Sequence, residues 1–228
     1  DVFRYDALTD AMVLVSTDSS GVQGNGDSYA IGISDDGLQV LFDSRATNLV
    51  VSDFNASRDV FLKDFASGTT TRVAVSASGA ELIVDSLGCA LSGNGNAAYF
   101  RSAGPFGTSA ATRGSLQDLY DVFRRHLPSA TTSITSSDAG GVDGDAESLC
   151  AVATNGARYA AFSSYAGNLV GDGGNGYPQL FLKDAQSGSV ERLASAAGPL
   201  FAISISDDKR SVCFTSPAAD VIAGVSNL

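Results

Sequence analysis

The chain has 228 residues, 44% of them hydrophobic, which is enough to bury the core of one substantial domain. Its 14 Lys and Arg residues stand against 25 Asp and Glu, giving a formal net charge of −11. This charge argues against nucleic acid and anionic membranes as partners and favours cations or basic surfaces. No apolar run approaches the roughly 18 residues of a membrane-spanning helix, and the first residues lack a signal-peptide pattern, so we expect a soluble, mature or excised chain.

One hexamer recurs along the chain, and a second motif recurs once in each copy. The hexamer is DVFRYD at 1–6, DVFLKD at 59–64, DVFRRH at 121–126 and QLFLKD at 179–184. The second motif, a polar turn leading into a strand that ends in Phe, stands at 34–42, 92–100, 154–162 and 206–214. Repetition at a fixed step of about 58 residues indicates an array of one structural unit.

Each copy divides into short apolar stretches bounded by Gly, Ser, Asn and Asp, which is typical of β-strands joined by tight turns. In chain order the predicted strands are 1–5, 12–16, 29–33, 39–42, 59–63, 71–75, 89–92, 97–100, 121–123, 132–134, 150–152, 159–162, 180–183, 190–194, 201–206 and 211–214. Four strands per repeat match one propeller blade. The sequence therefore predicts an all-β fold, a single β-propeller domain over 1–228 with about four 58-residue, four-stranded blades and repeats starting near 1, 59, 121 and 179.

The repeat is out of phase with the ends of the sequence. The chain opens at the third strand of one blade and closes after the second strand of another. Two arrangements are open: the N-terminal and C-terminal strand pairs complete one blade and close a ring of four, or 1–228 is a segment of a larger propeller. The first arrangement would pair strand edges that otherwise invite aggregation.

Together the turn, the strand ending in Phe, the N-L-V step at 48–50 and 168–170, and DVFLKD resemble TolB-like, WD-repeat-like propeller repeats of secreted bacterial proteins. The resemblance covers essentially the whole chain. It implies an extracellular, cell-surface or periplasmic protein and says little about activity, because such propellers serve as binding, scaffolding and occasionally enzymatic frames. The second copy departs from the pattern, with PFGTSAATRGSLQDLY at 105–120 in place of the N-L-V step.

The loop SDFNASRD at 52–59 carries Asp53, Asn55 and Asp59 at positions 1, 3 and 7 counted from Asp53, a partial calcium-loop spacing. The equivalent loop keeps Asp172 and Asn175. We predict a Ca²⁺ site at these five residues, with one alternative: Asp and Asn side chains often only stabilise turns through their own backbone.

Other residues are weaker candidates. A metal role for Asp143, Asp145 and Glu147 is less favoured, and His126, the only histidine, is expected in a surface turn. Cys89, Cys150 and Cys213 are interpreted as buried small hydrophobes, with a Cys89–Cys150 disulfide left open. The aromatic residues at fixed repeat positions are expected in the core; they are Phe3, Phe42, Phe61, Phe100, Phe123, Phe162, Phe181 and Phe214.

No motif for catalysis or nucleotide binding stands out. The leading hypothesis is a noncatalytic, exported β-propeller that acts as a binding or assembly scaffold for a protein or carbohydrate ligand and is stabilised by calcium. Two alternatives remain: a structural subunit that self-assembles through its terminal strand edges, and a propeller hydrolase or polysaccharide lyase. Convergence of acidic and basic side chains in one pocket would favour the enzyme.

Overall fold

The computed structural model describes residues 1–103 and 119–217, and within these ranges every regular element is a β-strand. Three four-stranded antiparallel sheets follow one another, flanked by a two-stranded sheet on each side. The first pair is β1 (Phe3–Asp6) and β2 (Ala11–Leu14), and the last is β15 (Phe201–Ile205) and β16 (Val212–Thr215). The complete sheets are β3 (Ser28–Ile33), β4 (Gln39–Ser44), β5 (Asp59–Asp64) and β6 (Thr70–Arg72); β7 (Ser86–Leu91), β8 (Ala97–Ser102), β9 (Asp121–His126) and β10 (Thr131–Ile134); and β11 (Ser148–Ala153), β12 (Tyr159–Ser164), β13 (Gln179–Asp184) and β14 (Val190–Ala194).

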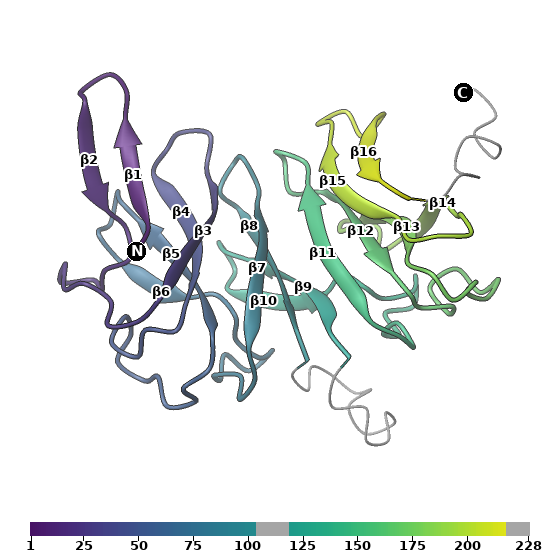
Figure 1. The fold of residues 1–228 in the computed structure, drawn as a ribbon, viewed down its shortest axis with the longest axis horizontal. Helices are drawn as coiled ribbons and strands as arrows, with labels where there is room; N and C mark the ends of the chain where they lie inside the picture. Colours follow the sequence, from purple (N-terminus) through teal and green to yellow (C-terminus); the bar gives the residue numbers. More distant parts are fainter. Residues whose placement is uncertain (104–118, 218–228) are drawn as a thin grey trace.

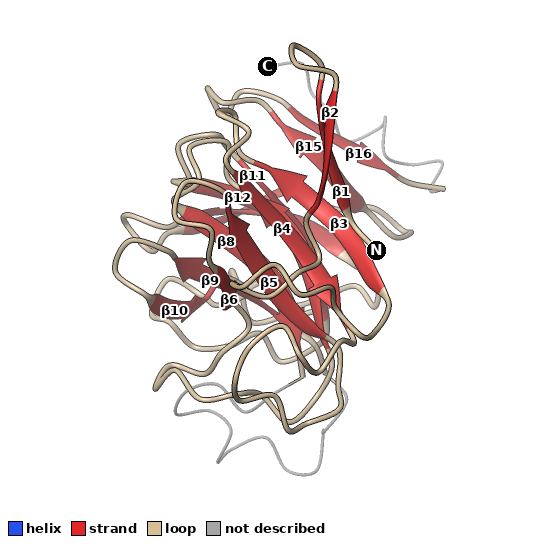
Figure 2. Ribbon diagram, turned by 90° about the vertical axis from the view of Figure 1, so that its left-hand side faces the viewer, coloured by secondary structure: helices blue, strands red, loops and turns tan. Residues whose placement is uncertain are grey.

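The five sheets stand side by side, with β1–β2 at one end of the row and β15–β16 at the other (Figure 1). The first strands of neighbouring complete sheets contact one another, β3 against β7 and β7 against β11, and β11 in turn contacts β15. Each sheet is therefore a blade that packs on the next, and Figure 2 views these blades from the β1–β2 end of the row. The all-β propeller expected from the repeat is confirmed.

Of the two arrangements of the ends, the structure shows the open one. The strands β1–β2 and β15–β16 form two separate sheets, and three complete blades stand between them. In the described residues, β1 pairs only with β2, and β16 only with β15. The repeat thus gives three complete blades and two half-blades, as in a partial propeller.

The turn before the second strand of each blade explains part of the repeat. Its fourth residue takes a positive φ in all four copies: Gly37 at 70°, Gly95 at 69°, Ala157 at 61° and Lys209 at 58°. Such a φ is easiest for glycine. Since two copies reach it with other residues, the motif is set by the backbone of the turn rather than by the residue.

The strand aromatics form the centre of each complete blade. A Phe of the second strand stacks on a Phe of the third, with ring centroids 5.7 Å apart for Phe42–Phe61 and 5.6 Å for Phe162–Phe181, and the same stacking joins β8 to β9. These six rings are buried, as predicted. The expectation was wrong for Phe3, which is 58% exposed, and Phe214 is only partly buried, because each stands in a half-blade that lacks the partner strand.

The interpretation of the cysteines as buried hydrophobes was also wrong. Cys89 on β7 and Cys150 on β11 form a disulfide, and Cys213 on β16 is free and exposed. The innermost strands of two blades lie close enough for the bond, with the two Cα atoms 5.1 Å apart. One pair of neighbouring blades is therefore joined covalently.

Buried lysines join other parts of neighbouring sheets. Lys63 of β5 reaches the loop after β2, where its Nζ donates to Thr17 Oγ1 at 3.0 Å and to the Asp18 carbonyl at 2.9 Å. Lys183 of β13 reaches the loop after β10 in the same way, donating to the Ser137 and Asp138 carbonyls, each at 2.9 Å. Both ammonium groups therefore bind the loop of the preceding sheet.

The described residues include no helix long and apolar enough to cross a membrane.

Candidate functional site

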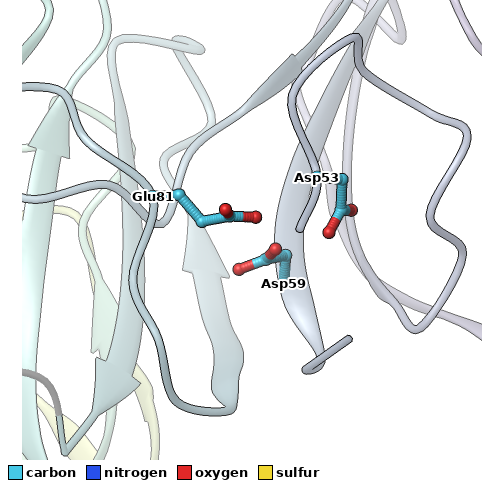
Figure 3. A group of neighbouring side chains, drawn as sticks. All are labelled: Asp53, Asp59 and Glu81. Carbon is cyan, nitrogen blue, oxygen red and sulfur yellow. The ribbon is translucent and has the colours of Figure 1, made fainter. Parts of the chain in front are cut away.

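Three carboxylates meet beside the start of β5. Asp59 is the first residue of β5, Asp53 lies in the loop before it, and Glu81 comes from the loop between β6 and β7 (Figure 3). One oxygen from each lies within 4.8 Å of the others. This acidic group could hold a metal ion.

An arginine already lies among these carboxylates. Arg72, the last residue of β6, places Nη2 3.2 Å from Asp53 Oδ2 and 2.8 Å from Glu81 Oε1, and Nε 3.1 Å from Asp59 Oδ2. Its side chain is 8% exposed, and the guanidinium carbon lies 6.0 Å from the centre of the Phe61 ring. The resident countercharge of the group is therefore a guanidinium.

One guanidinium does not balance three carboxylates. With all four groups ionised, three negative charges face one positive charge. Burial raises the pKa of Asp59 to about 7, although Arg72 opposes the rise, and burial also raises the pKa of Asp53. The Oδ1 atoms of Asp53 and Asp59 are buried and accept no hydrogen bond from any described residue. A proton or an added cation would relieve this imbalance.

Asn55, the third residue predicted in this loop, serves the turn. Its Nδ2 donates to the Leu82 carbonyl at 2.5 Å and to Asp59 Oδ2 at 3.3 Å, while its Oδ1 accepts from the Ser57 amide at 2.8 Å. The side chain thus turns a donor toward the carboxylates. For Asn55 the structure therefore agrees with the alternative, in which the side chain stabilises the turn through backbone groups.

The equivalent loop of the last complete blade is built differently. Asp172 pairs with Arg192, and Asn175 Oδ1 accepts from the Tyr177 amide at 3.0 Å and from Gln179 Nε2 at 2.5 Å. Within the described ranges, Asp53, Asp59 and Glu81 are the one group of three possible metal ligands, and Asp172 and Asn175 stand outside it. A metal role for Asp172 and Asn175 stays a prediction.

Sequence reasoning missed Glu81 and Arg72. A sequence signal for Arg72 existed, because Arg192 stands at the same distance after its own hexamer. In the structure each arginine places its guanidinium carbon near the ring of the hexamer Phe, Arg72 near Phe61 and Arg192 near Phe181.

Glu81 holds the turn position of Gln23 and Asp143, since the same isolated bridge joins Thr17 to Gln23, Val75 to Glu81 and Ser137 to Asp143. The repeat therefore marked the position of Glu81, although the residue type there changes from copy to copy.

The weaker candidates do not converge on a site. Asp145 Oδ1 accepts from the Gly167 amide at 2.7 Å, and Glu147 pairs with Arg101 at 3.6 Å. His126 ends β9, and its Nδ1 lies 2.6 Å from Ser129 Oγ in the turn that follows, as expected of a turn histidine. The departure at 105–120 falls almost wholly on 104–118, outside the described residues.

A cavity of about 360 Å³ lies between the second and third complete blades. Tyr99, Arg124 and Lys183 line it. Lys183 donates its hydrogen bonds to Ser137 and Asp138 of the neighbouring loop, whereas the buried Arg124 Nε has no acceptor among the described residues. The volume is in the range of small-ligand sites, and no sequence motif pointed to it.

No protein-family model and no curated protein sequence matches the chain. Solved structures do resemble it. An oligogalacturonate lyase from Vibrio parahaemolyticus is 14% identical over 95% of this chain and 52% of its own, with a TM-score of 0.54. TolB from Acinetobacter baumannii is 14% identical over 95% of this chain and 48% of its own, with a TM-score of 0.48, and the tricorn protease is 9% identical over 94% and 22%, with a TM-score of 0.50.

The fold is that of a β-propeller. The propeller fold expected from the repeat is confirmed at this level. The chain spans about half the length of the lyase and TolB structures that it matches. At these identities the likeness shows the fold alone, so the activity of a propeller enzyme does not transfer to this chain.

Proposed function

We propose that this propeller is a noncatalytic scaffold for binding or assembly in an exported protein. The observation that carries the proposal is the use of charge at repeated positions: Lys63 and Lys183 are buried and bind the loop of the preceding sheet. Acidic and basic side chains also converge at one place, where Arg72 forms ion pairs with Asp53, Asp59 and Glu81 and all four side chains are largely buried. Charged groups used in this way support the shape of the array.

The disulfide supports the exported location. Bonds such as Cys89–Cys150 form and persist in oxidising compartments, and are rare in the cytosol. This agrees with the extracellular, cell-surface or periplasmic setting that the repeat implied. The partner, a protein or a carbohydrate, would bind on the loops that the rigid blades hold in place.

Calcium is the narrower part of the proposal. Its double positive charge would offset the excess negative charge of Asp53, Asp59 and Glu81, and the unpaired Oδ1 atoms of the two aspartates are oxygen ligands of the kind it prefers. Arg72 would have to move aside to admit it. A proton on Asp59 is the competing way to reduce the charge.

The calcium part is tested by melting curves of the wild-type chain and Asp59→Asn with millimolar calcium and with chelator. A ligand that binds only the folded state stabilises it by mass action, by about 2.7 kcal/mol at a hundred times its dissociation constant. We expect calcium to raise the wild-type melting temperature and to leave Asp59→Asn unchanged. Equal melting temperatures with calcium and chelator in the wild-type chain would remove calcium from the proposal.

The noncatalytic part is tested by incubation with oligogalacturonate and with peptides, in the presence of calcium or manganese, followed by chromatography of the products. We expect the substrates to be recovered intact. Turnover that survives rigorous purification would overturn the scaffold and establish the enzyme alternative.

A further inference from the structure

The cavity between the second and third complete blades has a positively charged wall. Three charged residues line it: Arg124 of β9, Lys183 of β13 and Asp138 of the loop after β10. Asp138 Oδ1 accepts from the Gly140 and Val142 amides, each at 2.8 Å, and Lys183 donates to the loop after β10. The loop therefore holds the carboxylate and the ammonium group, and the guanidinium of Arg124 is the remaining charge of the wall.

Arg124 differs from the other arginines that the structure describes. Apart from Arg124 and Arg125, each of them has a carboxylate oxygen at 3.8 Å or less, and Arg125 Nη1 donates to Thr132 Oγ1 at 3.0 Å. Arg124 has no such carboxylate in the described ranges, and its buried Nε has no acceptor there. Burial raises the pKa of the neighbouring Tyr99, although Arg124 opposes the rise, so Tyr99 is a neutral phenol that leaves the charge of Arg124 in place.

The strand register shows which residues Arg124 and Tyr99 replace. Tyr99 on β8 faces Arg124 on β9. In the first complete blade the same two positions hold Leu41 and Leu62, and in the third they are also apolar. Both leucines are buried in the apolar cluster that joins the first blade to the second. The second complete blade thus presents a polar and cationic pair where its neighbours present an apolar pair.

The residue after the hexamer decides how well each joint is filled. It is Phe65 in the first complete blade, Leu127 in the second and Ala185 in the third. Leu127 packs against the cluster that contains Leu62, so apolar side chains fill the joint between the first and second blades. Ala185 lines the cavity at the next joint and has no atoms beyond Cβ to fill it. Where the first joint holds two leucines, the second therefore holds an arginine and open space.

The first half-blade shows what an arginine at this hexamer position can bind. Arg4 holds the position of Arg124, and its guanidinium carbon lies 4.6 Å from the centre of the Phe65 ring in the next blade. Its Nη2 lies 3.8 Å from Asp6 Oδ2. An aromatic face attracts a guanidinium through the ring quadrupole, and a carboxylate pairs with its charge. Arg4 thus has both an aromatic and an acidic partner.

Arg124 has neither partner, because Ala185 stands at the position of Phe65 and His126 stands at the position of Asp6. We propose that the cavity binds a small aromatic carboxylate, whose ring lies on the face of the Arg124 guanidinium and whose carboxylate pairs with its N–H edge. Since the face and the edge of a guanidinium are perpendicular, a short flexible chain joins the ring to the carboxylate. The ligand then supplies the two groups that the chain itself supplies to Arg4.

The remaining wall of the cavity suits such a ligand. Tyr99, Ile134 and Ala160 offer apolar surface to the ring. The volume of about 360 Å³ is that of a small-molecule site. This site goes beyond the scaffold function, because the ligand lies between two blades rather than on the loops that are offered to a partner.

The test is a calorimetric titration with 3-phenylpropanoate, which has the ring, the carboxylate and a two-carbon chain between them. We expect saturable binding with a dissociation constant of about 1 mM or tighter. Binding of 3-cyclohexylpropanoate, which has no aromatic ring, should be at least about threefold weaker, and that of the uncharged 3-phenylpropanamide at least about tenfold weaker. Equal affinities for the three compounds, or no saturable binding of 3-phenylpropanoate at millimolar concentrations, would overturn the proposal.

Two variants taken from the repeat locate the site. Arg124→Leu introduces the residue of the first complete blade, and we expect it to weaken the binding of 3-phenylpropanoate at least about tenfold. Ala185→Phe introduces the ring that covers Arg4, so it should fill the cavity and abolish binding. Because this variant adds apolar contacts without removing any, its melting temperature should be at least that of the wild-type chain, which shows that it is folded.

Arg210→Leu is the matched control for the lost charge. The side chain of Arg210 is 85% exposed in a turn of the last half-blade, so the affinity for 3-phenylpropanoate should stay that of the wild-type chain. Unchanged affinity in Arg124→Leu or in a folded Ala185→Phe would place the ligand elsewhere and overturn the proposed site. Each of these outcomes leaves the noncatalytic scaffold untouched.

Discussion

Asp59 shows how the same residue position is used differently along the array. In the first full copy it is a buried carboxylate beside Arg72, and in the last it is the neutral Gln179, whose Nε2 donates to Asn175 Oδ1. In the second, Asp121 accepts from the Ser136 hydroxyl at 2.8 Å, and Asp1 accepts from Ser16 at 2.9 Å. The hexamer therefore fixes a strand start, while the partner of its first residue decides the local charge.

The first prediction is that stability falls with rising pH through Asp59. Because its pKa in the folded chain is about 7, above the usual value of 3.8, its contribution is complete below about pH 4 and is lost as pH rises through 7. A shift of this size corresponds to at most about 4 kcal/mol. Asp59→Asn should flatten the dependence of unfolding free energy on pH from 4 to 8, measured by urea denaturation. The converse variant, Gln179→Glu, should add a pH dependence to a blade that now lacks this carboxylate; no change in either variant would contradict the assignment.

Strands were predicted better than the contacts between them. The turn and hexamer motifs located all sixteen described strands to within a few residues, because short apolar stretches between polar turns carry a local signal. The alignment of Glu81 with Asp53, the disulfide between Cys89 and Cys150 and the lysine contacts were not predictable in this way. They depend on how one blade lies against the next, which spacing along the sequence does not encode.

The second prediction concerns Lys63, which joins β5 to the loop after β2. Lys63→Met keeps the length of the side chain but leaves the Thr17 hydroxyl and Asp18 carbonyl without their donor. Hydrogen bonds to a charged group contribute about 1.5 to 3 kcal/mol, so we expect a loss of about 2 kcal/mol. Lys209→Met, at an exposed turn, is the matched control and should change stability by less than about 0.5 kcal/mol in the same urea titration. Equal losses of unfolding free energy in the two variants would show that the buried hydrogen bonds of Lys63 do not stabilise the fold.

The third prediction concerns the covalent joint between β7 and β11. Cys89→Ser with Cys150→Ser removes a cross-link between residues 61 apart in sequence, and we expect a loss of about 2 to 4 kcal/mol. Cys213→Ser, which removes only a free thiol, should leave the unfolding free energy unchanged. Guanidinium denaturation without reductant measures both, and a double variant as stable as the wild-type chain would mean that the bond adds nothing to the folded array.

At the scale of the whole molecule, the repeat predicted the kind of fold, but not whether its ends meet. Phe3 and Phe214 stand in the same motifs as the six buried phenylalanines, so the repeat predicted Phe3 in the core, whereas it is at the surface. Only the relative positions of the half-blades separate a closed ring of four blades from an open row. Closure is a property of the angle between successive blades, and small differences in packing accumulate along the row.

An array in which each blade touches only its neighbours comes apart from its weakest joint. The disulfide lies between the second and third complete blades, whereas the described contacts between the first and second are noncovalent. Hydrogen exchange should therefore find β3–β6 opening first and the β7–β14 pair persisting as a unit. Reduction of the one bond would remove that difference, so the redox potential of the surroundings would decide the order in which the blades unfold, and with it which peptide bonds a protease meets first.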